Sequence, residues 1–187
     1  EQFGVRPGGE IDLHQVGYLF LHTEPEAWAV AREAVALQNS MGVPTRLLTA
    51  AEAGALSKGV DVSDVIGATF HPRDGYCSPE NVVQGYAAGA RALGATVRTG
   101  VGVTGIETRG GEITGVVTTD GVVETSTVVC AAGAWSREVG TWVGVDLPVQ
   151  PYRRHCFTTK PLAFAREDLP MIVDMKSGVY MHRESGG

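Results

Sequence analysis

Hydrophobic residues recur along this chain with a period of either two or about 3.6, and the alternation of the two periods predicts its elements. Apolar side chains at helical spacing predict helices at residues 24–40, 49–56, 78–93 and 136–143. Alternating or continuous apolar runs predict strands at residues 16–21, 65–71, 96–98, 101–107, 112–119, 122–124, 127–131, 148–159, 171–174 and 178–182. This order of elements predicts a mixed α/β protein.

Polar residues mark where the helices begin. Thr23 precedes the first helix, and Thr49 with Glu52 forms the pattern of a capping box. Ser78 and Pro79 are a typical cap and first-turn pair for the third helix. The apolar positions of that helix predict a buried stripe made of Val82, Val83, Tyr86, Ala87, Ala90 and Leu93.

Composition narrows the class of protein. The chain has 187 residues, a formal charge of −6 and 43% apolar residues, which fits a globular protein and disfavours a nucleic-acid partner. No apolar run is long enough for a membrane span. Cys77, Cys130 and Cys156 are odd in number and widely spaced, so we expect no disulfide framework and no metal site. A reducing, cytoplasmic location follows, with Cys130 as a small buried side chain of its strand.

One glycine pattern imitates a dinucleotide-binding turn. Gly100, Gly102 and Gly105 have the G-x-G-x-x-G spacing. The mechanism requires a helix after the glycines, whereas residues 106–111 have the composition of a strand that leads into a glycine turn. We therefore predict a strand and no cofactor role for this motif.

The segment 128–136 carries the most information about function. It has the pattern of a buried strand, then Ala131, Ala132 and Gly133, then the start of a helix, and small residues at such a junction let a ligand approach the backbone closely. The stretches GVVTTDG, VVCAAGAWS and LPVQP resemble the second half of the FAD-binding region in the glycine oxidase/sarcosine oxidase family of flavin amine oxidoreductases, the D-amino acid oxidase type. The resemblance covers nearly the whole chain, and TTKPL and YMHRES are most similar to the branch of the sarcosine oxidase β-subunit and dimethylglycine dehydrogenase.

The resemblance implies two interleaved domains. Residues 74–146 would be part of an FAD-binding α/β domain, and residues 1–73 and 147–187 would form a substrate domain of β-sheet plus helices. The family's N-terminal G-x-G-x-x-G unit has no counterpart here, so we expect an internal fragment of a larger enzyme. FAD would bind to the parent protein and not to this fragment alone, and exposed sheet edges make a homodimer or other subunits plausible.

Five residues are the cofactor-binding candidates that the resemblance implies. Val103 would lie in a strand beside the adenine, and Ala131, Ala132 and Gly133 would give the close backbone approach. Trp135 would line the cofactor side of the helix start. The alternative for Val103 and Trp135 is an ordinary core side chain.

The substrate-binding candidates are Tyr180, His182, Arg183 and His155. Alternation places Tyr180 and His182 on one face of their strand, and the family presents a tyrosine to the substrate there. In the predicted strand 148–159, a period of two would place Arg153 and His155 on the same face. The alternative for Tyr180 and His182 is a pair that faces solvent. The alternative for Arg183 is a place in a surface turn, and the alternative for His155 is a structural histidine. No catalytic residue is assigned.

Three further histidines have no partner spacing and are interpreted as surface or satisfied residues: His14, His22 and His71.

The resemblance implies an FAD-dependent oxidoreductase that oxidises the C–N bond of a small secondary or tertiary amino acid, such as sarcosine, dimethylglycine, glycine or proline. The flavin would accept a hydride from the carbon next to nitrogen. Two alternatives stay open: an excised, non-catalytic domain without a tight ligand, and a same-fold FAD enzyme that acts on a polyol phosphate such as glycerol 3-phosphate.

Overall fold

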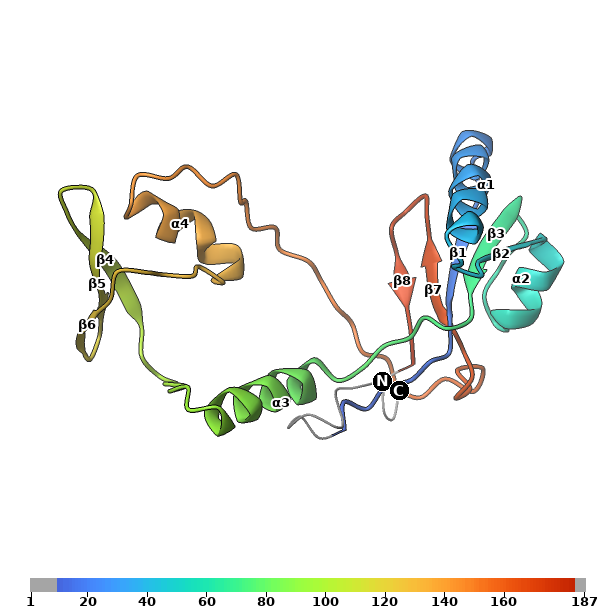
Figure 1. Cartoon of the computed structure of the whole chain (residues 1–187). Coiled ribbons are helices and arrows are strands. Elements are labelled where there is room, and N and C mark those ends of the chain that lie inside the picture. Colours follow the sequence, from blue (N-terminus) through green and yellow to red (C-terminus); the bar gives the residue numbers. More distant parts are fainter. Residues whose placement is uncertain (1–9, 184–187) are drawn as a thin grey trace. The chain divides into compact units, whose positions relative to one another are not determined.

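The computed structural model describes residues 10–183, which form two compact units (Figure 1). The larger unit contains residues 10–94 and 157–183 of the described chain, and the smaller unit contains residues 95–156. Both combine strands with helices, which confirms the predicted mixed α/β class.

The larger unit is built on a five-stranded sheet. Its strand order is β2-β3-β1-β7-β8. Strand β1 lies at the centre, antiparallel to β3 and parallel to β7, so the last part of the unit completes a sheet begun by the first part. The strands are β1 (Tyr18–His22), β2 (Arg46–Leu48), β3 (Gly67–His71), β7 (Met171–Asp174) and β8 (Tyr180–Met181).

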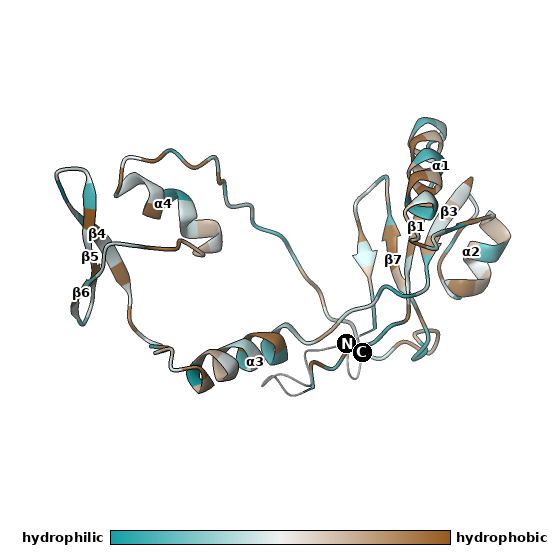
Figure 2. Ribbon diagram, viewed as in Figure 1, coloured by the Kyte–Doolittle hydropathy of each residue, from teal (hydrophilic) through white to brown (hydrophobic). Residues whose placement is uncertain are grey.

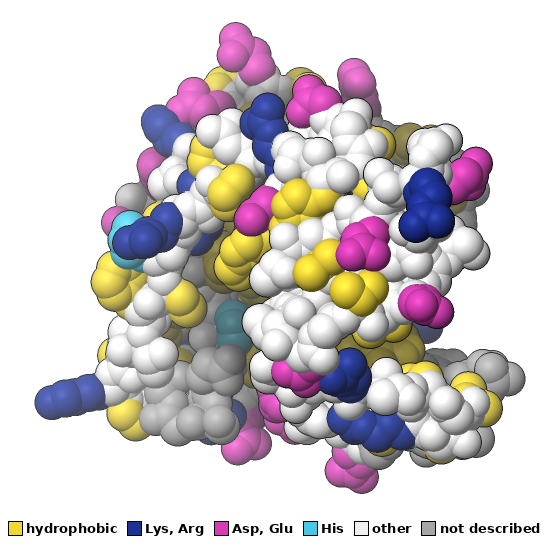
Figure 3. Space-filling view, turned by 90° about the vertical axis from the view of Figure 1, so that its left-hand side faces the viewer, with side chains coloured by type: hydrophobic (Ala, Val, Ile, Leu, Met, Phe, Trp, Pro, Cys, Tyr) yellow, Lys and Arg dark blue, Asp and Glu magenta, His cyan; other side chains and the backbone are white. Residues whose placement is uncertain are grey.

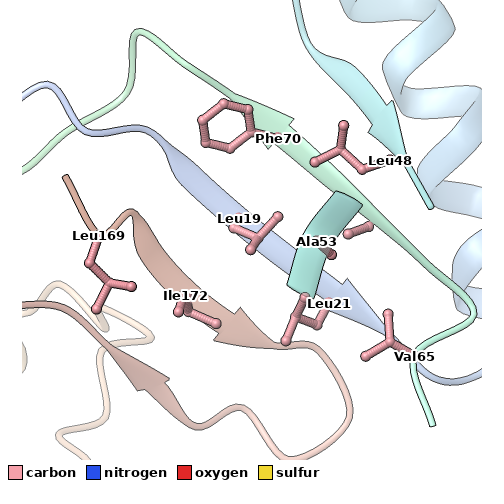
Figure 4. Packing of buried hydrophobic residues seen from close by; sticks show 9 residues of the cluster. Leu19, Leu21, Leu48, Ala53, Val65, Phe70, Leu169 and Ile172 are labelled. Carbon is pink, nitrogen blue, oxygen red and sulfur yellow. The ribbon is translucent and has the colours of Figure 1, made fainter. Parts of the chain in front are cut away.

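One face of this sheet, which we call the core face, carries the hydrophobic core (Figure 4). Leu19 pairs with Phe70 and Ile172, so the three side chains emerge on the same side of the sheet. Helix α2 (Ala50–Leu56) supplies Ala53 to this cluster. Burial of these apolar groups is the main force that holds the unit together.

Helix α1 (Pro25–Ser40) packs on the opposite face. The indole ring of Trp28 fills the space where a side chain at Gly67 would lie, and Val35 is buried. The residues that alternate with the core residues form this opposite face. They are Tyr18, Phe20, His22, Gly67, Thr69, His71, Met171, Val173 and Tyr180.

The helix caps agree with the sequence in two of three cases. Thr49 and Glu52 form the predicted capping box of α2, and Ser78 accepts a hydrogen bond from the N–H of Asn81 at the start of α3 (Pro79–Ala92). Thr23 does not cap α1. The cap residue is Glu24, and the hydroxyl of Thr23 is buried with no hydrogen-bond partner in the described structure.

The predicted buried stripe of α3 is wrong. Val83, Tyr86 and Leu93 are 59%, 68% and 90% exposed, and the buried residue of this helix is Gly85. Figure 2 shows hydrophobic and hydrophilic residues alternating along α3. The pattern is amphipathic as predicted, but none of the six residues is buried, and Val82, Ala87 and Ala90 are half-buried.

The smaller unit contains a three-stranded antiparallel sheet in the order β4-β5-β6. Its strands are β4 (Val103–Arg109), β5 (Glu112–Thr118) and β6 (Gly121–Glu124). The glycines at 110 and 111 have positive φ and turn β4 into β5, which confirms that the G-x-G-x-x-G pattern precedes no helix. A 3-10 helix, η1 (Gly133–Trp135), leads into α4 (Ser136–Thr141).

Three predicted strands are absent from the described residues. Residues 96–98, 127–131 and 148–159 have no ladder hydrogen bonds, because no neighbouring strand pairs with them. Cys130, predicted to be buried, is exposed, and Val129 is 87% exposed. On the face drawn in Figure 3, hydrophobic side chains lie at the surface among charged ones.

The compact units divide after residues 94 and 156, whereas the predicted domains divide after residues 73 and 146. Helix α3 therefore clusters with the larger unit. The assignment of FAD-binding and substrate domains stays a prediction. None of the described helices is long and apolar enough to cross a bilayer.

Candidate active-site face

Two of the predicted substrate residues, Tyr180 and His182, lie at the end of strand β8. Tyr180 pairs with Val173, which pairs with Phe20, so these three side chains share a face. His182 is the residue after the end of β8. Tyr180 is 59% exposed and His182 is half-buried, so both can be reached from solvent.

The imidazole of His182 has a defined orientation. Its ring lies against the ring of Tyr76, with centroids 4.7 Å apart, and its Nδ1 atom is 3.1 Å from the carbonyl oxygen of Arg183. A carbonyl oxygen accepts hydrogen bonds, so Nδ1 carries the proton of the neutral ring. The Nε2 atom is then the one that can accept a hydrogen bond from a ligand.

Tyr76 is held in turn by His14. The two residues form an antiparallel bridge, with backbone N–O distances of 2.8 and 3.1 Å, and their rings stack 5.2 Å apart. Gly75 makes this possible, since a side chain there would collide with the carbonyl oxygen of His14. No local signal in the sequence predicted this bridge, because it joins segments that are distant along the chain.

Arg183 is less well placed for a substrate. Its guanidinium is 34% exposed and lies 4.0 Å from the carboxylate of Glu167. This weak ion pair fits the surface-turn alternative for Arg183.

His155 and Arg153 belong to the smaller unit, in a segment without regular structure. Because the predicted strand 148–159 does not form, its alternation no longer places the two side chains on one face. The expectation that His155 or Arg153 shares a face with Tyr180 and His182 stays a prediction.

The cofactor candidates lie in the smaller unit. Val103 is the first residue of β4 and is half exposed. Gly133 has φ 54° and no atom within 4 Å of the point where its Cβ would lie, and Trp135 is 69% exposed. The buried strand expected before Ala131 is absent, but the open backbone at Gly133 suits close approach by another molecule.

The surroundings of two histidines, His22 and His71, bear on the interpretation of these residues as surface or satisfied side chains. The ring nitrogens of His22 are buried without a hydrogen-bond partner in the described part of the chain, whereas Nδ1 of His71 lies 2.9 Å from Oδ1 of Asp74. Burial lowers the pKa of His22. No group of three or more metal-ligating side chains occurs among residues 10–183.

Comparison with known proteins shows where this arrangement belongs. The model of the family described as DAO, FAD dependent oxidoreductase, matches residues 2–187. The chain is a member of this FAD dependent oxidoreductase family. The family membership predicted from the sequence is thereby confirmed, and the family is one of FAD-dependent enzymes.

Relatives within the FAD dependent oxidoreductase family lie in the predicted branch. The chain is 27% identical to mitochondrial dimethylglycine dehydrogenase of Mus musculus over 100% of its length and 22% of that protein. It is 27% identical to mitochondrial sarcosine dehydrogenase of Mus musculus over 92% of its length and 20% of that protein.

A solved structure supports the fold. L-proline dehydrogenase from P. horikoshii superposes with a TM-score of 0.81 at 27% identity, over 100% of this chain and 50% of that chain. The chain therefore spans about half of this solved relative and about a fifth of the curated ones.

Proposed function

We propose that the whole protein is an FAD-dependent oxidoreductase that oxidises the C–N bond of a small secondary or tertiary amino acid, with dimethylglycine, sarcosine and proline as the first candidates. The observation that carries the proposal is the family match over residues 2–187, together with the dimethylglycine and sarcosine dehydrogenases among the relatives. Bound FAD would accept the hydride from the carbon next to nitrogen.

The open part of the opposite face supplies the substrate-binding groups. The phenol of Tyr180 can donate a hydrogen bond to the substrate carboxylate. The Nε2 atom of His182 can accept a hydrogen bond or a proton from the substrate amine. The amine must be unprotonated when the neighbouring carbon loses its hydride, because the nitrogen lone pair assists that loss. Tyr76 packs against the imidazole and keeps it in this orientation. Arg183 and His155 are kept as further candidates for the carboxylate.

The cofactor is proposed to be held by backbone in the smaller unit. Ala131 and Ala132 precede η1 and Gly133 is its first residue, and the positive φ and open space at Gly133 fit close contact with the cofactor. Val103 would run beside the adenine, and the exposed indole of Trp135 would cover part of the cofactor.

We further propose a reducing, cytoplasmic setting and an assembly with another copy or subunit. The described cysteines Cys77, Cys130 and Cys156 are all free, which supports a reducing setting. The exposed apolar side of α3 supports contact with further protein.

Steady-state assays of the whole, FAD-loaded protein test the proposal. Sarcosine, dimethylglycine, glycine and proline are compared with glycerol 3-phosphate, each with an artificial electron acceptor. Turnover of at least one of the four amino acids supports the proposal. Turnover of glycerol 3-phosphate alone, or of none of the five by protein that holds FAD, contradicts it.

A further inference from the structure

Tyr180, the residue proposed to bind the substrate carboxylate, lies in a strand of two residues. Strand β8 is the last strand in the order of the larger sheet, and a short loop joins it to β7, its partner (Figure 1). Tyr180 pairs with Val173 and so emerges on the face opposite the core. A shift of one residue in this pairing would turn the phenol to the core face. Since the turn of a hairpin fixes its register, the loop between β7 and β8 decides where the phenol points.

The side chain of Asp174 organises this loop. Its carboxylate accepts hydrogen bonds from the backbone N–H of Lys176 at 3.0 Å and of Ser177 at 3.2 Å, and from the hydroxyl of Ser177. The hydroxyl oxygen of Ser177 accepts a hydrogen bond at 3.2 Å from the N–H of Val179, the residue before Tyr180. The hydrogen bond from the Ser177 hydroxyl is the main cause that holds the pKa of Asp174 below its ordinary value, so the carboxylate is ionised at neutral pH. Side-chain hydrogen bonds therefore connect the end of β7 to the start of β8.

Backbone hydrogen bonds close the loop and attach it to the centre of the sheet. The N–H of Asp174 donates to the carbonyl oxygen of Val179, and the N–H of Gly178 donates to the carbonyl oxygen of Asp174, each at 2.9 Å. Gly178 has φ 72°, which glycine adopts without steric cost. The N–H of Met175 donates to the carbonyl oxygen of Leu21 in β1 at 3.1 Å. The loop is thus both closed on itself and held against the central strand.

Lys176 adds a weaker contact. Its Nζ lies 2.6 Å from Oε1 of Glu24, but the two side chains are 62% and 49% exposed, and ion pairs open to solvent contribute little. Asp174 is half-buried and its carboxylate accepts several charge-assisted hydrogen bonds, so it is the stronger constraint on the loop.

We propose that Asp174 and Ser177 are positioning residues for the C–N oxidation: they fix the register of β8 and thereby present the phenol of Tyr180 to the substrate carboxylate. The role of Tyr180 rests on the proposed function, whereas the register of β8 does not. Neither Asp174 nor Ser177 needs to touch the substrate. Loss of their hydrogen bonds should therefore affect the reaction through Tyr180.

NMR of the chain tests the register directly. Side chains directly opposite each other on paired strands have Cβ atoms about 4.5–5.5 Å apart, so nuclear Overhauser contacts between the Tyr180 ring and the Val173 methyl groups report the register. Asp174→Ala should lose these contacts, and Asp174→Asn, which keeps an acceptor oxygen, should retain them. Asp168→Ala is the matched control and should retain them, because Asp168 precedes β7 and pairs with Arg166 outside the loop.

Kinetics of the whole, FAD-loaded protein test the consequence for the substrate. Asp174→Ala should raise KM for the amino acid by about tenfold and leave kcat within about threefold, because loss of a contact made equally by bound substrate and transition state changes KM alone. Asp174→Asn and Asp168→Ala should keep KM within about twofold. The double variant Tyr180→Phe/Asp174→Ala should have KM within about twofold of Tyr180→Phe, since Asp174 acts through the phenol. If Asp174 only stabilised the fold, the two losses would multiply.

The proposal is overturned if Asp174→Ala keeps the contacts between Tyr180 and Val173, if its KM is unchanged, or if the losses multiply in the double variant. If Asp174→Ala does not fold, Ser177→Ala removes the hydroxyl and Ser177→Thr keeps it, and the same measurements on this pair decide. If the unmodified protein turns over no amino acid, the proposed function fails and the role of Tyr180 fails with it, while the NMR comparison still decides whether Asp174 fixes the register.

Discussion

The ring of Tyr76 packs against the imidazole of His182, with 4.7 Å between the ring centroids and an angle of 39° between the ring planes. Tyr76 belongs to the loop after β3 and His182 follows β8, so the contact joins the two chain segments that make up the larger unit. The orientation of one proposed substrate-binding group therefore depends on a residue that has no proposed contact with the substrate.

Tyr76→Ala should reduce the activity of the whole protein through this contact. An aromatic pair contributes about 0.5–1.5 kcal/mol beyond area burial, so kcat/KM should fall by roughly two- to tenfold. Tyr76→Phe keeps the ring and should retain kcat/KM near the unmodified value. Equal losses in the two variants would show that the hydroxyl, and not the ring contact, is what matters.

Tyr180→Phe should weaken substrate binding if the phenol donates to the substrate carboxylate. A hydrogen bond to a charged group contributes about 1.5–3 kcal/mol, which corresponds to at least a tenfold fall in kcat/KM. Val179→Ala is the matched control, since Val179 is adjacent and 67% exposed. The methyl ester of the substrate lacks the carboxylate charge, and the loss in Tyr180→Phe should be smaller with it. A loss of the same size with both substrates would rule out the proposed contact.

Gly133→Val should abolish FAD binding by the whole protein, while Cys130→Ala should leave it intact. Gly133 has φ 54°, which a β-branched residue rarely adopts, and a side chain there would enter the space proposed for the cofactor. Cys130 is exposed, so its truncation should cost little stability. Titration of the folded variants with FAD measures their affinity for the cofactor. Normal FAD affinity in Gly133→Val would show that this segment is not part of the cofactor site.

Two threonines before helices provide a matched test of capping. Thr49 accepts a hydrogen bond from the N–H of Glu52, whereas the buried hydroxyl of Thr23 has no hydrogen-bond partner in the described structure. Thr49→Val should destabilise the chain by about 1 kcal/mol. Thr23→Val keeps the shape and removes an unpartnered hydroxyl, so it should be neutral or stabilising. Urea unfolding of both variants tests this, and a larger loss in Thr23→Val would contradict the structure.

His22 should make stability depend on pH. Burial places its folded-state pKa below the unfolded value of about 6.5, so the unfolded chain binds the proton first as pH falls. The free energy of unfolding should therefore decrease as pH falls from about 6.5 toward the lowered pKa, and recover as pH rises. His22→Phe should remove this contribution, while the more exposed His14→Phe should leave it in place. A pH dependence that is the same with and without His22 would contradict its burial.

Much of the larger unit could be predicted from local patterns. The apolar run of β1, the capping box at Thr49 and the Ser78-Pro79 start of α3 are short-range signals, and the structure confirms them. The segments 127–131 and 148–159 have strand-like composition, but a strand also needs a partner for its backbone groups, and none of the described residues provides one. Composition alone cannot supply that information.

The site was harder to predict than the fold. Alternation places Tyr180 on the face opposite the core, because a period of two is a property of the strand itself, but β8 ends at Met181 and the shared face of Tyr180 and His182 stays a prediction. Tyr76 and His14 were missed since their bridge depends on long-range pairing. The burial of His22 had a weak signal, because it continues the alternation of Tyr18 and Phe20 on the face that α1 covers.

Anaerobic mixing of the whole, FAD-loaded protein with substrate tests the central claim most directly. The protein is mixed with dimethylglycine, sarcosine or proline in the absence of any acceptor, and the flavin absorbance is followed. The account predicts that at least one of these amino acids bleaches the oxidised flavin and yields the corresponding imine or its hydrolysis product. Flavin that stays oxidised with all three, yet is bleached by glycerol 3-phosphate, would contradict the account.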